Sequence, residues 1–369
     1  MPFADELLGI DAASELARIV SDATGNPAPN LDAAARVLDP LALGERAAIL
    51  RDALLADVPG NTDALAAVIR TAQRSAPEFT GWMIWPVTLA ASARAVSEGS
   101  DAAFDTGMSL QAELTGRLTA EFGIRALLSA DLHRALATML EWTTSPDPAV
   151  RRLATEGSRQ YLPWGTRVHQ LMREPAATIS ILDALHLDDD EVVRRSVANH
   201  LNDLSRGNAE LVVATAQRWL DERTSADTTT LPLVRHALRT LIKRGDVEAL
   251  ALMGFSAGSF TVDGPTLDLE VVPFGGAIEL SATVVNTGAT TAKVAIDYVV
   301  HHQKANGTTT TKTFKYAVVE LAPGESVAVR RIHSFRPITT RRYHPGTHAI
   351  AVQVNGVATE PARFELAAE

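Results

Sequence analysis

One short phrase is written twice in this chain and a third time more loosely, and it limits the possible folds more than any other feature. The two clear copies cover residues 147–154 and 190–197. Their anchoring valines, Val150 and Val193, stand 43 residues apart, and Val234 of the looser copy follows 41 residues later. This period is typical of HEAT or armadillo-like helical pairs. Each repeat is therefore predicted to be one helical hairpin.

Each clear copy has the pattern of a helix start. Asp147 and Asp190 stand where a side chain caps the free N–H groups of the first turn. Apolar residues then recur every three or four positions, which predicts a buried face on each helix. These faces are Val150, Leu153, Ala154 and Gly157, then Val193, Val197, Leu201 and Leu204. The polar stripes are Arg152, Glu156 and Arg159, then Arg195, Asn199, Asn202 and Asp203.

The hydrophobic period changes near Gly254. Upstream, helices are predicted over 3–22, over 31–75 with a break at 58–60, and across 103–142. Downstream, apolar residues alternate, as in 278–284 and 294–300, with turn signals such as Asn306-Gly307. We therefore predict a HEAT-like α-solenoid over 1–254, followed by an immunoglobulin-like β-sandwich of about seven strands over 259–369.

Composition narrows the possible classes of protein. The 369 residues include no cysteine, which excludes disulfides and thiolate zinc sites. The acidic start lacks the features of a signal peptide and no apolar run could span a membrane, so we expect a cytoplasmic protein. The net charge of −10 arises within residues 1–150, which hold 10 basic and 20 acidic side chains. The repeats can therefore still present a local basic track to a phosphate backbone.

Several runs resemble the AlkC branch of the HEAT-like-repeat DNA glycosylases, which carry a C-terminal immunoglobulin-like domain. The runs are 120–125, 151–159, 162–164, 193–203 and 235–243. The resemblance implies a base excision repair enzyme that hydrolyses the N-glycosidic bond of small cationic bases, N3-methylcytosine and N3-methyladenine, in duplex DNA. It further implies that the damaged nucleotide is not flipped out. We expect a monomer that needs no cofactor and no metal.

By the same resemblance, the catalytic residues are Glu121, Glu156, Trp164 and Asp203. Carboxylates near an anomeric carbon stabilise the oxocarbenium-like state of glycosidic cleavage. A tryptophan face can contact the sugar or a cationic base. A base that is already cationic departs without a general acid, so carboxylates alone suffice.

The residues by themselves leave ordinary alternatives open. The acids can instead form pairs at helical spacing, with Arg125 serving Glu121, Arg152 serving Glu156 and Asn199 bonding Asp203. Trp164 can be a buried structural residue. The aromatic cluster 81–86 is predicted to pack in the core, with a ligand platform as its alternative. The pair at 301–302 does not predict a metal site, because neighbouring strand residues point to opposite faces.

The predicted DNA contacts lie on repeat helices and on two β-domain loops. They are Arg152, Arg159, Arg195, Asn199, Arg235, Arg239 and Lys243, with Lys304, Arg341 and Arg342 on the loops. Cations at repeated helix positions can track a phosphate backbone. Internal ion pairs and solvated hairpin tips remain the alternatives.

Two other functions stay open. A non-catalytic scaffold with the same two domains would bind DNA or a protein partner, since fold alone does not decide function. The second is an enzyme with the specificity of the sister, AlkD-like branch, which is for bulky N7-alkylated purines. The predicted β domain argues against the second, because the sister branch lacks that domain.

Overall fold

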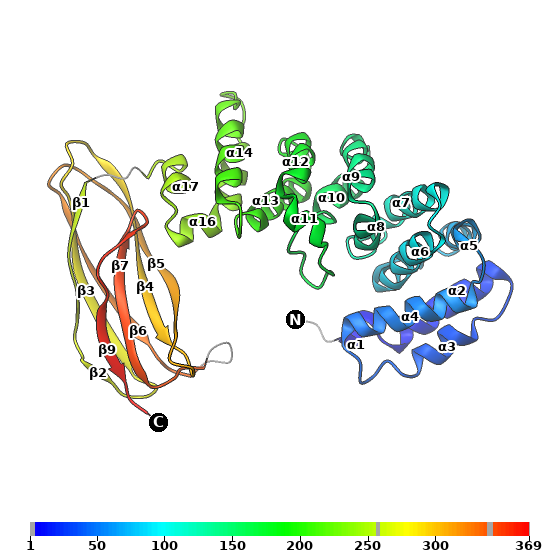
Figure 1. Ribbon diagram of the computed structural model, residues 1–369, viewed down its shortest axis with the longest axis horizontal. Coiled ribbons are helices and arrows are strands. Elements are labelled where there is room, and N and C mark those ends of the chain that lie inside the picture. The colour runs from blue at the N-terminus through cyan, green and yellow to red at the C-terminus, as the bar shows by residue number, and fades with distance from the viewer. Residues whose placement is uncertain (1–3, 256–258, 338–341, 369) are drawn as a thin grey trace. The chain divides into compact units, whose positions relative to one another are not determined.

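The computed structural model describes residues 4–255, 259–337 and 342–368. Its helices come first along the chain and its strands last, so an α-solenoid followed by a β-sandwich is confirmed (Figure 1). The chain divides into two compact units. One comprises residues up to 212 together with 222–237, and the other comprises 213–221 together with residues from 238 onward.

The described helices follow one another with short connections. In chain order they are α1 (Ala4–Leu8), α2 (Ile10–Thr24), α3 (Pro29–Ala35), α4 (Leu43–Asp57), α5 (Thr62–Ser75), α6 (Ile84–Glu98), α7 (Asp101–Thr115), α8 (Ile124–Ala130), α9 (Leu132–Glu141), α10 (Pro148–Glu156), α11 (His169–Arg173), α12 (Ile179–Leu185), α13 (Glu191–Leu204), α14 (Ala209–Asp221), α15 (Thr230–Ala237), α16 (Arg239–Arg244) and α17 (Val247–Leu252). Short 3-10 helices cover Gly81–Met83, Trp142–Thr144 and Pro175–Thr178.

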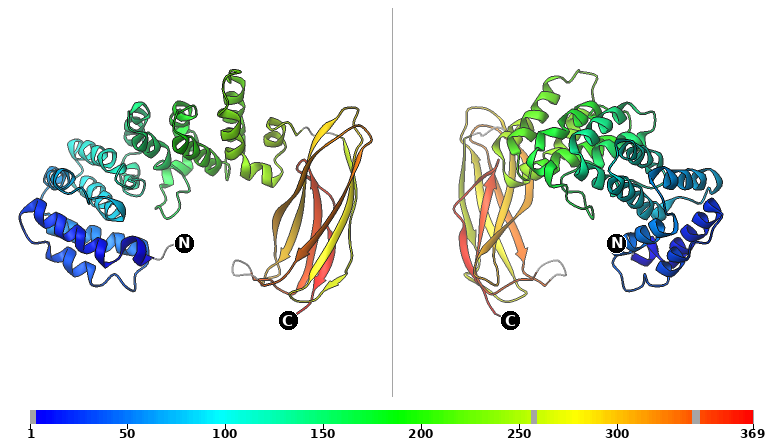
Figure 2. Two further views of the ribbon diagram at one scale, coloured as in Figure 1. Left: turned by 180° about the vertical axis from the view of Figure 1, so that it is seen from behind. Right: turned by 45° about the vertical axis from the view of Figure 1, so that its right-hand side comes forward.

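The repeated phrase forms the starts of α10 and α13, as predicted. The carboxylate of Asp147 accepts a hydrogen bond from the Ala149 amide at 2.8 Å, and that of Asp190 accepts one from the Val192 amide at 2.7 Å. All of the predicted buried-face residues are buried. Helix α10 packs against α13, and α13 packs against α15. The helices of the first unit stack in chain order (Figure 2).

Two predicted helical stretches are interrupted where the sequence analysis expected continuity. The chain leaves helical structure between α3 and α4, where Pro40 follows Asp39, and again at 116–123 between α7 and α8. The second break begins at Gly116 and ends at Gly123, where a Cβ would stand 2.5 Å from the Gln111 side chain and 2.7 Å from Thr88. A larger residue than glycine therefore does not fit, and the break places Glu121 on a loop.

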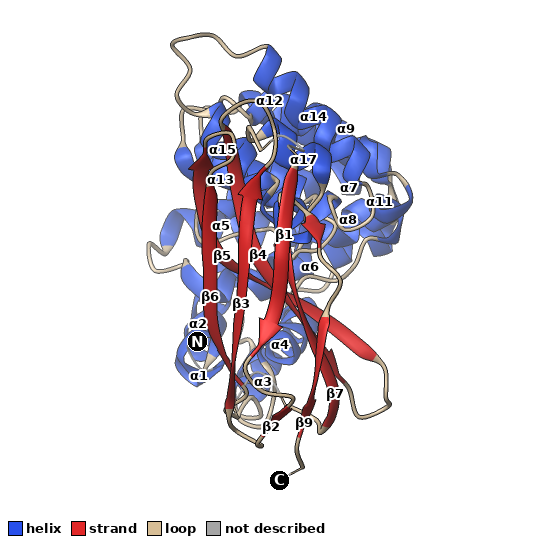
Figure 3. Ribbon diagram, turned by 90° about the vertical axis from the view of Figure 1, so that its left-hand side faces the viewer, coloured by secondary structure: helices blue, strands red, loops and turns tan. Residues whose placement is uncertain are grey.

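The strands form two sheets that enclose one apolar core (Figure 3). They are β1 (Phe260–Leu267), β2 (Val271–Val272), β3 (Ala277–Asn286), β4 (Ala292–Gln303), β5 (Thr309–Leu321), β6 (Ser326–Ser334), β7 (Gly346–Val354), β8 (Val357–Ala358) and β9 (Ala362–Leu366). One sheet has the order β1-β3-β6 and the other has the order β2-β9-β7-β4-β5, with β8 beside β7. All pairings are antiparallel except that of β2 with β9.

The alternation read from the sequence sets the inward faces of β3 and β4. Ile278 and Leu280 of β3, and Ile296 and Val300 of β4, are buried in this core. The Asn306-Gly307 turn joins β4 to β5 as predicted, with Gly307 at φ +76° and Gln303 paired with Thr309. Period-two patterning and turn chemistry are local signals, which is why this part of the prediction holds.

Candidate active site

Three of the four predicted catalytic side chains line one pocket in the helical unit. Its lining residues are Trp82, Leu118, Thr119, Glu121, Phe122, Glu156, Pro163 and Trp164, and its volume is about 210 Å³. Within this described lining, the two charged residues are both carboxylates, and three others are aromatic. Aromatic faces and carboxylates both attract positive charge. The pocket is therefore suited to a small cationic group.

Behind the pocket, acids and arginines alternate in one connected series, which we term the acid–arginine chain. Arg152 Nη1 donates to Glu121 Oε2 at 3.0 Å, and Arg152 Nη2 lies 3.8 Å from Glu156 Oε2. Arg159 Nη1 then donates to Glu156 Oε1 at 2.5 Å, and Arg159 Nε donates to Asp203 Oδ2 at 2.8 Å. The residues come from α10, from the loops that follow α7 and α10, and from α13. Each acid is held in place by at least one guanidinium.

Glu156 lies at the centre of the acid–arginine chain. Its carboxylate also accepts a hydrogen bond from Ser196 Oγ at 2.5 Å, a partner on α13 that the sequence analysis did not identify. Burial alone would raise the pKa of Glu156, but the charges of Arg159 and Arg152 and the Ser196 bond outweigh it and lower the pKa. Glu156 is therefore ionised at neutral pH, although it is buried.

Asp203 lies at the far end of the acid–arginine chain and is not among the residues that line the pocket. Its burial raises its pKa, and the contact with Arg159 offsets only part of that effect. The Asn199 amide oxygen lies 3.0 Å from His236 Nε2 on α15. Asp203 is thus joined to the other acids through Arg159.

Trp164 stands on the loop after α10 with a strained backbone. Its φ is +63°, a left-handed conformation that costs a bulky residue of the order of 1–3 kcal/mol. Trp164 is 60% exposed, so the alternative of a buried structural tryptophan does not hold. Its ring lies 6.4 Å from that of Trp82 across the pocket lining. Strain at an exposed aromatic residue is typical of a functional position.

Arg125 stabilises the loop after α10 from the protein interior. The fully buried guanidinium donates to the carbonyls of Gly157 and Arg159, both at 2.9 Å, and to that of Thr166. The alternative pairing of Arg125 with Glu121 is therefore wrong, because the side chain turns toward the loop instead. Sequence could not reveal this role, because the bonded carbonyls are 32 to 41 residues away and carry no side-chain signature.

The aromatic cluster 81–86 divides between two environments. Trp85 is buried and stacks on Phe122 with ring centroids 4.3 Å apart, as predicted for the core. Trp82 lies only 6.0 Å from Trp85 yet lines the pocket. Trp82 belongs to the 3-10 helix Gly81–Met83 and is half-buried, whereas Trp85 belongs to the first turn of α6 and is buried.

His200 of α13 supports the same region from the protein interior. Its Nδ1–H donates to the Thr155 carbonyl at 2.9 Å, so the neutral ring accepts the Thr178 hydroxyl through Nε2 at 3.1 Å. Burial of the fully enclosed ring lowers its pKa to about 4, although the bond to Thr155 acts in the opposite direction. The folded protein therefore excludes a proton that the unfolded chain accepts near pH 6.5.

We expect the free energy of unfolding to fall as the pH drops from about 6.5 to about 4, because protonation then favours the unfolded chain. By proton linkage, protonation of His200 in the unfolded chain lowers the free energy of unfolding by about 3 kcal/mol at about pH 4. Urea denaturation of the wild type and His200→Gln at several pH values checks this. The difference in stability between the two proteins should shrink as the solution becomes acidic, and two parallel curves would contradict the assignment.

The predicted DNA-contacting residues of the helical unit occupy different environments. Arg195 and Arg235 are exposed, and Arg195 pairs with Glu191 at 3.0 Å on the surface of α13. Arg159 is only 8% exposed and bonds two carboxylates. A phosphate could reach it only by displacing those partners, so the position argues against a DNA contact. Arg152 is half-buried at the edge of the acid–arginine chain.

In the second unit, Lys243 at the end of α16 is exposed and Arg239 at its start is half-buried. Lys304 is exposed in the turn between β4 and β5, and Arg342 is exposed ahead of β7. Arg341 lies outside the described residues. The positions of these side chains are compatible with contacts to a large partner.

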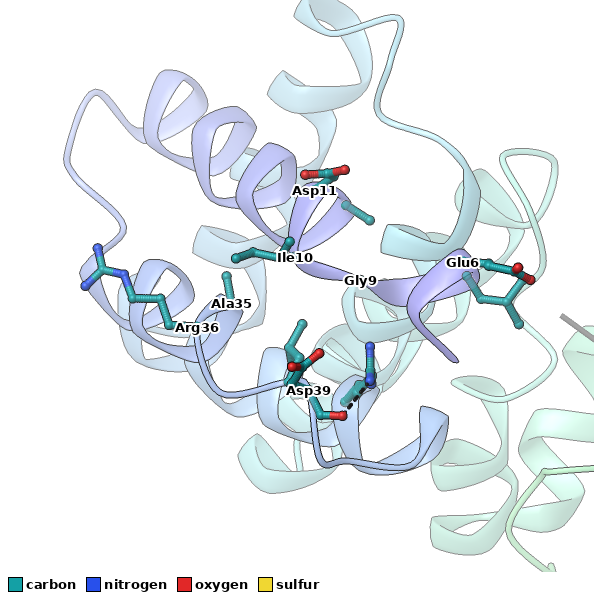
Figure 4. A pocket seen from close by; sticks show the side chains of 11 residues that line it. Glu6, Gly9, Ile10, Asp11, Ala35, Arg36 and Asp39 are labelled. Atoms are coloured by element: carbon teal, nitrogen blue, oxygen red, sulfur yellow. Dashed lines mark hydrogen bonds between the residues drawn. The ribbon is translucent and has the colours of Figure 1, made fainter. Parts of the chain in front are cut away.

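Elsewhere in the helical unit, a larger pocket of about 700 Å³ lies among α1–α4 and shares no residue with the predicted site (Figure 4). Its buried Arg46 donates to the carbonyls of Leu41, Leu8 and Asp39, which links the segments around it. Over the described residues, no cluster of three or more His, Asp or Glu side chains has the arrangement of a metal site. None of the described helices could cross a membrane.

Known proteins resemble this chain in both its helical and its β-sheet parts. A family model described as "Uncharacterised protein YhaZ, C-terminal Ig-like domain" matches residues 261–368. YhaZ of Bacillus subtilis (strain 168) is 34% identical over 249 residues, which cover 67% of this chain and 68% of YhaZ. The structure of the Pseudomonas fluorescens alkylpurine DNA glycosylase AlkC, bound to DNA containing an abasic site analog, aligns over 100% of both chains with a TM-score of 0.80 and 32% identity.

Proposed function

The chain belongs to the AlkC-type DNA glycosylases of the HEAT-like-repeat family, and we propose that it hydrolyses the N-glycosidic bond of small cationic bases in duplex DNA. The proposed substrates are N3-methylcytosine and N3-methyladenine. As a DNA glycosylase of alkylation repair, it would release the damaged base and leave an abasic site in double-stranded DNA. The solved relative was bound to the analogue of such a product.

One observation carries the proposal: the pocket that combines Glu121 and Glu156 with three aromatic rings. Glycosidic cleavage places positive charge on the sugar, and an alkylated base brings positive charge of its own. Carboxylates fixed in advance stabilise such charge without reorganising during the reaction. A scaffold that only binds DNA has no use for two acids at this position.

The four residues then take distinct roles. Glu121 and Glu156 face the developing sugar cation, and Trp164 contacts the sugar or the base through its π face. Asp203 adds a third negative charge and holds Arg159, which in turn holds Glu156. Water attacks the anomeric carbon, the glycosidic electron pair leaves with the base, and a proton is released to solvent. The base starts cationic and so leaves neutral.

The pocket also supports recognition without nucleotide flipping. Enzymes that flip a base usually enclose it in a pocket, and enclosed small-molecule sites typically measure roughly 300–1,000 Å³. This pocket is smaller, at about 210 Å³, and Trp164 on its wall is largely exposed. The carboxylates would therefore reach a sugar that remains in the helix. Exposed Arg195 and Arg235, with Lys304 and Arg342 of the β domain, would contact the DNA backbone.

Base release from duplexes that each carry one lesion tests the function. We expect the full-length protein to release N3-methylcytosine and N3-methyladenine faster than N7-methylguanine in single-turnover reactions. Faster release of N7-methylguanine would indicate the AlkD-like specificity instead. Tight DNA binding without release of any base would indicate a non-catalytic scaffold.

A further inference from the structure

Close to the candidate active site, two arginines stack over one tyrosine ring. The guanidinium carbon of Arg167 lies 4.4 Å from the centroid of the Tyr161 ring, and that of Arg206 lies 4.2 Å from it. Both arginines are exposed, whereas Tyr161 is half-buried. None of the three residues was predicted from the sequence to have a function. We refer to them as the tyrosine–arginine cluster.

No direct ion pair balances the charge of the cluster among the described residues, in contrast to several other arginines of this protein. Arg151, for example, is held by Asp188 through bonds of 2.6 and 3.0 Å, which neutralise it. Over the described residues, neither Arg167 nor Arg206 lies within ion-pair distance of a carboxylate. A ring orders a guanidinium through its π face without cancelling its charge. The two cations are therefore held in place with their charge still available.

The buried Arg125 lies near the cluster. Burial lowers the pKa of Arg125 to about 10, and the charges of Arg167 and Arg159 add to this effect, whereas those of Asp203 and Glu121 oppose it. The charge of Arg206 favours the ionised form of Asp203, which already bonds Arg159. A stacked guanidinium still has N–H groups along its edge that can donate to an anion. An anion bound there would relieve the repulsion between the cations.

The location indicates which anion this is. Tyr161 precedes Trp164 by three residues and Arg167 follows it by three, while Arg206 follows Asp203 by three. The cluster therefore shares its loop and helix end with the residues assigned to the damaged nucleotide. A duplex bound at the pocket also carries backbone phosphates on either side of the damaged nucleotide, since one strand has a phosphate for about every 3.4 Å of helix axis.

We propose that Tyr161, Arg167 and Arg206 form a phosphate-binding site that grips the DNA backbone beside the damaged nucleotide. The proposal rests on the proposed function, because the phosphodiester ligand is that of the bound duplex. It adds a positioning element that the acids and Trp164 do not supply. Catalytic carboxylates repel phosphates, so a duplex can approach them only if nearby cations compensate.

Equilibrium binding over a range of salt concentrations tests the cluster in the full-length protein. The probe is a duplex with one tetrahydrofuran abasic analogue, and the variants are Arg167→Ala, Arg206→Ala, Tyr161→Phe and Tyr161→Leu. Each arginine variant should weaken binding and reduce the slope of log affinity against log salt by about 1, the share of one phosphate contact. Tyr161→Phe should match the wild type. Tyr161→Leu should weaken binding with little change in slope, because both charges remain.

Arg173→Ala provides the matched control, because Arg173 is an exposed arginine at the end of nearby α11. Its salt slope should match that of the wild type. Slopes for Arg167→Ala and Arg206→Ala equal to that of Arg173→Ala would overturn the phosphate site, and base release by the wild type would then leave the proposed function intact. A wild-type protein without affinity for the duplex would overturn both. Addition of inorganic phosphate at constant ionic strength should not abolish the slope difference, and loss of that difference would indicate a free-phosphate site.

Discussion

Replacement of Glu156 by glutamine should lower single-turnover base release by about 100-fold or more and leave the protein folded. The change removes the charge at the centre of the acid–arginine chain and keeps nearly the same volume, while one of the two acceptor oxygens becomes an NH2 donor. A fixed electrostatic partner of a transition state typically contributes 10²–10³ in rate. The lowered pKa shows that Glu156 carries its full charge at neutral pH, so that the loss is complete.

Asp188→Asn is the matched control for this prediction. Asp188 is also a buried acid paired with an arginine of α10, but it lies outside the pocket lining. Its replacement should reduce the free energy of unfolding without a comparable loss of rate. A rate for Glu156→Gln within about threefold of the wild type would refute the assignment of Glu156. Equal losses of rate in both variants would point to a general effect on structure.

Replacement of Arg159 by alanine should have the largest effect on stability. It leaves Glu156 and Asp203 buried without the cation that both share. Removal of one partner of a buried ion pair typically costs about 3–5 kcal/mol, because the remaining charge is uncompensated. Thermal and urea denaturation measure the loss.

The same variant separates the structural role of Arg159 from the DNA contact predicted from sequence. Arg152→Ala should be milder, since the Arg152 side chain is 29% exposed and solvent screens its partners. If Arg159→Ala unfolds like the wild type but shows a shallower salt slope for DNA binding, the side chain is a phosphate contact after all. In contrast, Arg195→Ala should reduce that slope by about 1 with little change in stability.

The sequence predicted the features that depend on local pattern. The capping residues Asp147 and Asp190, the buried faces of α10 and α13 and the alternating strands β3 and β4 all follow from spacing and turn chemistry within a few residues. Family resemblance selected the four candidate catalytic residues. Three of them line one pocket although up to 43 residues separate them, which no local pattern could have predicted.

Features that depend on contacts between distant segments were predicted poorly. The stripe Arg152-Glu156-Arg159 was expected on one side of a helix, but Glu156 and Arg159 are buried because α13 supplies Ser196 and Asp203 opposite them. Arg159 was predicted to contact DNA because an arginine in a stripe gives no sign of its burial. The tyrosine–arginine cluster was missed because its members come from two segments of the chain.

The central claim is that this pocket stabilises positive charge on a sugar within duplex DNA. Competition between two duplexes tests it most directly, one with a pyrrolidine abasic analogue that is cationic at neutral pH and one with the neutral tetrahydrofuran analogue. A transition-state mimic should bind more tightly than its uncharged counterpart. We predict that the wild type prefers the cationic duplex by at least about tenfold, which corresponds to about 1.4 kcal/mol, and that Glu156→Gln loses most of this preference. Equal affinity of the wild type for the two duplexes would contradict the claim.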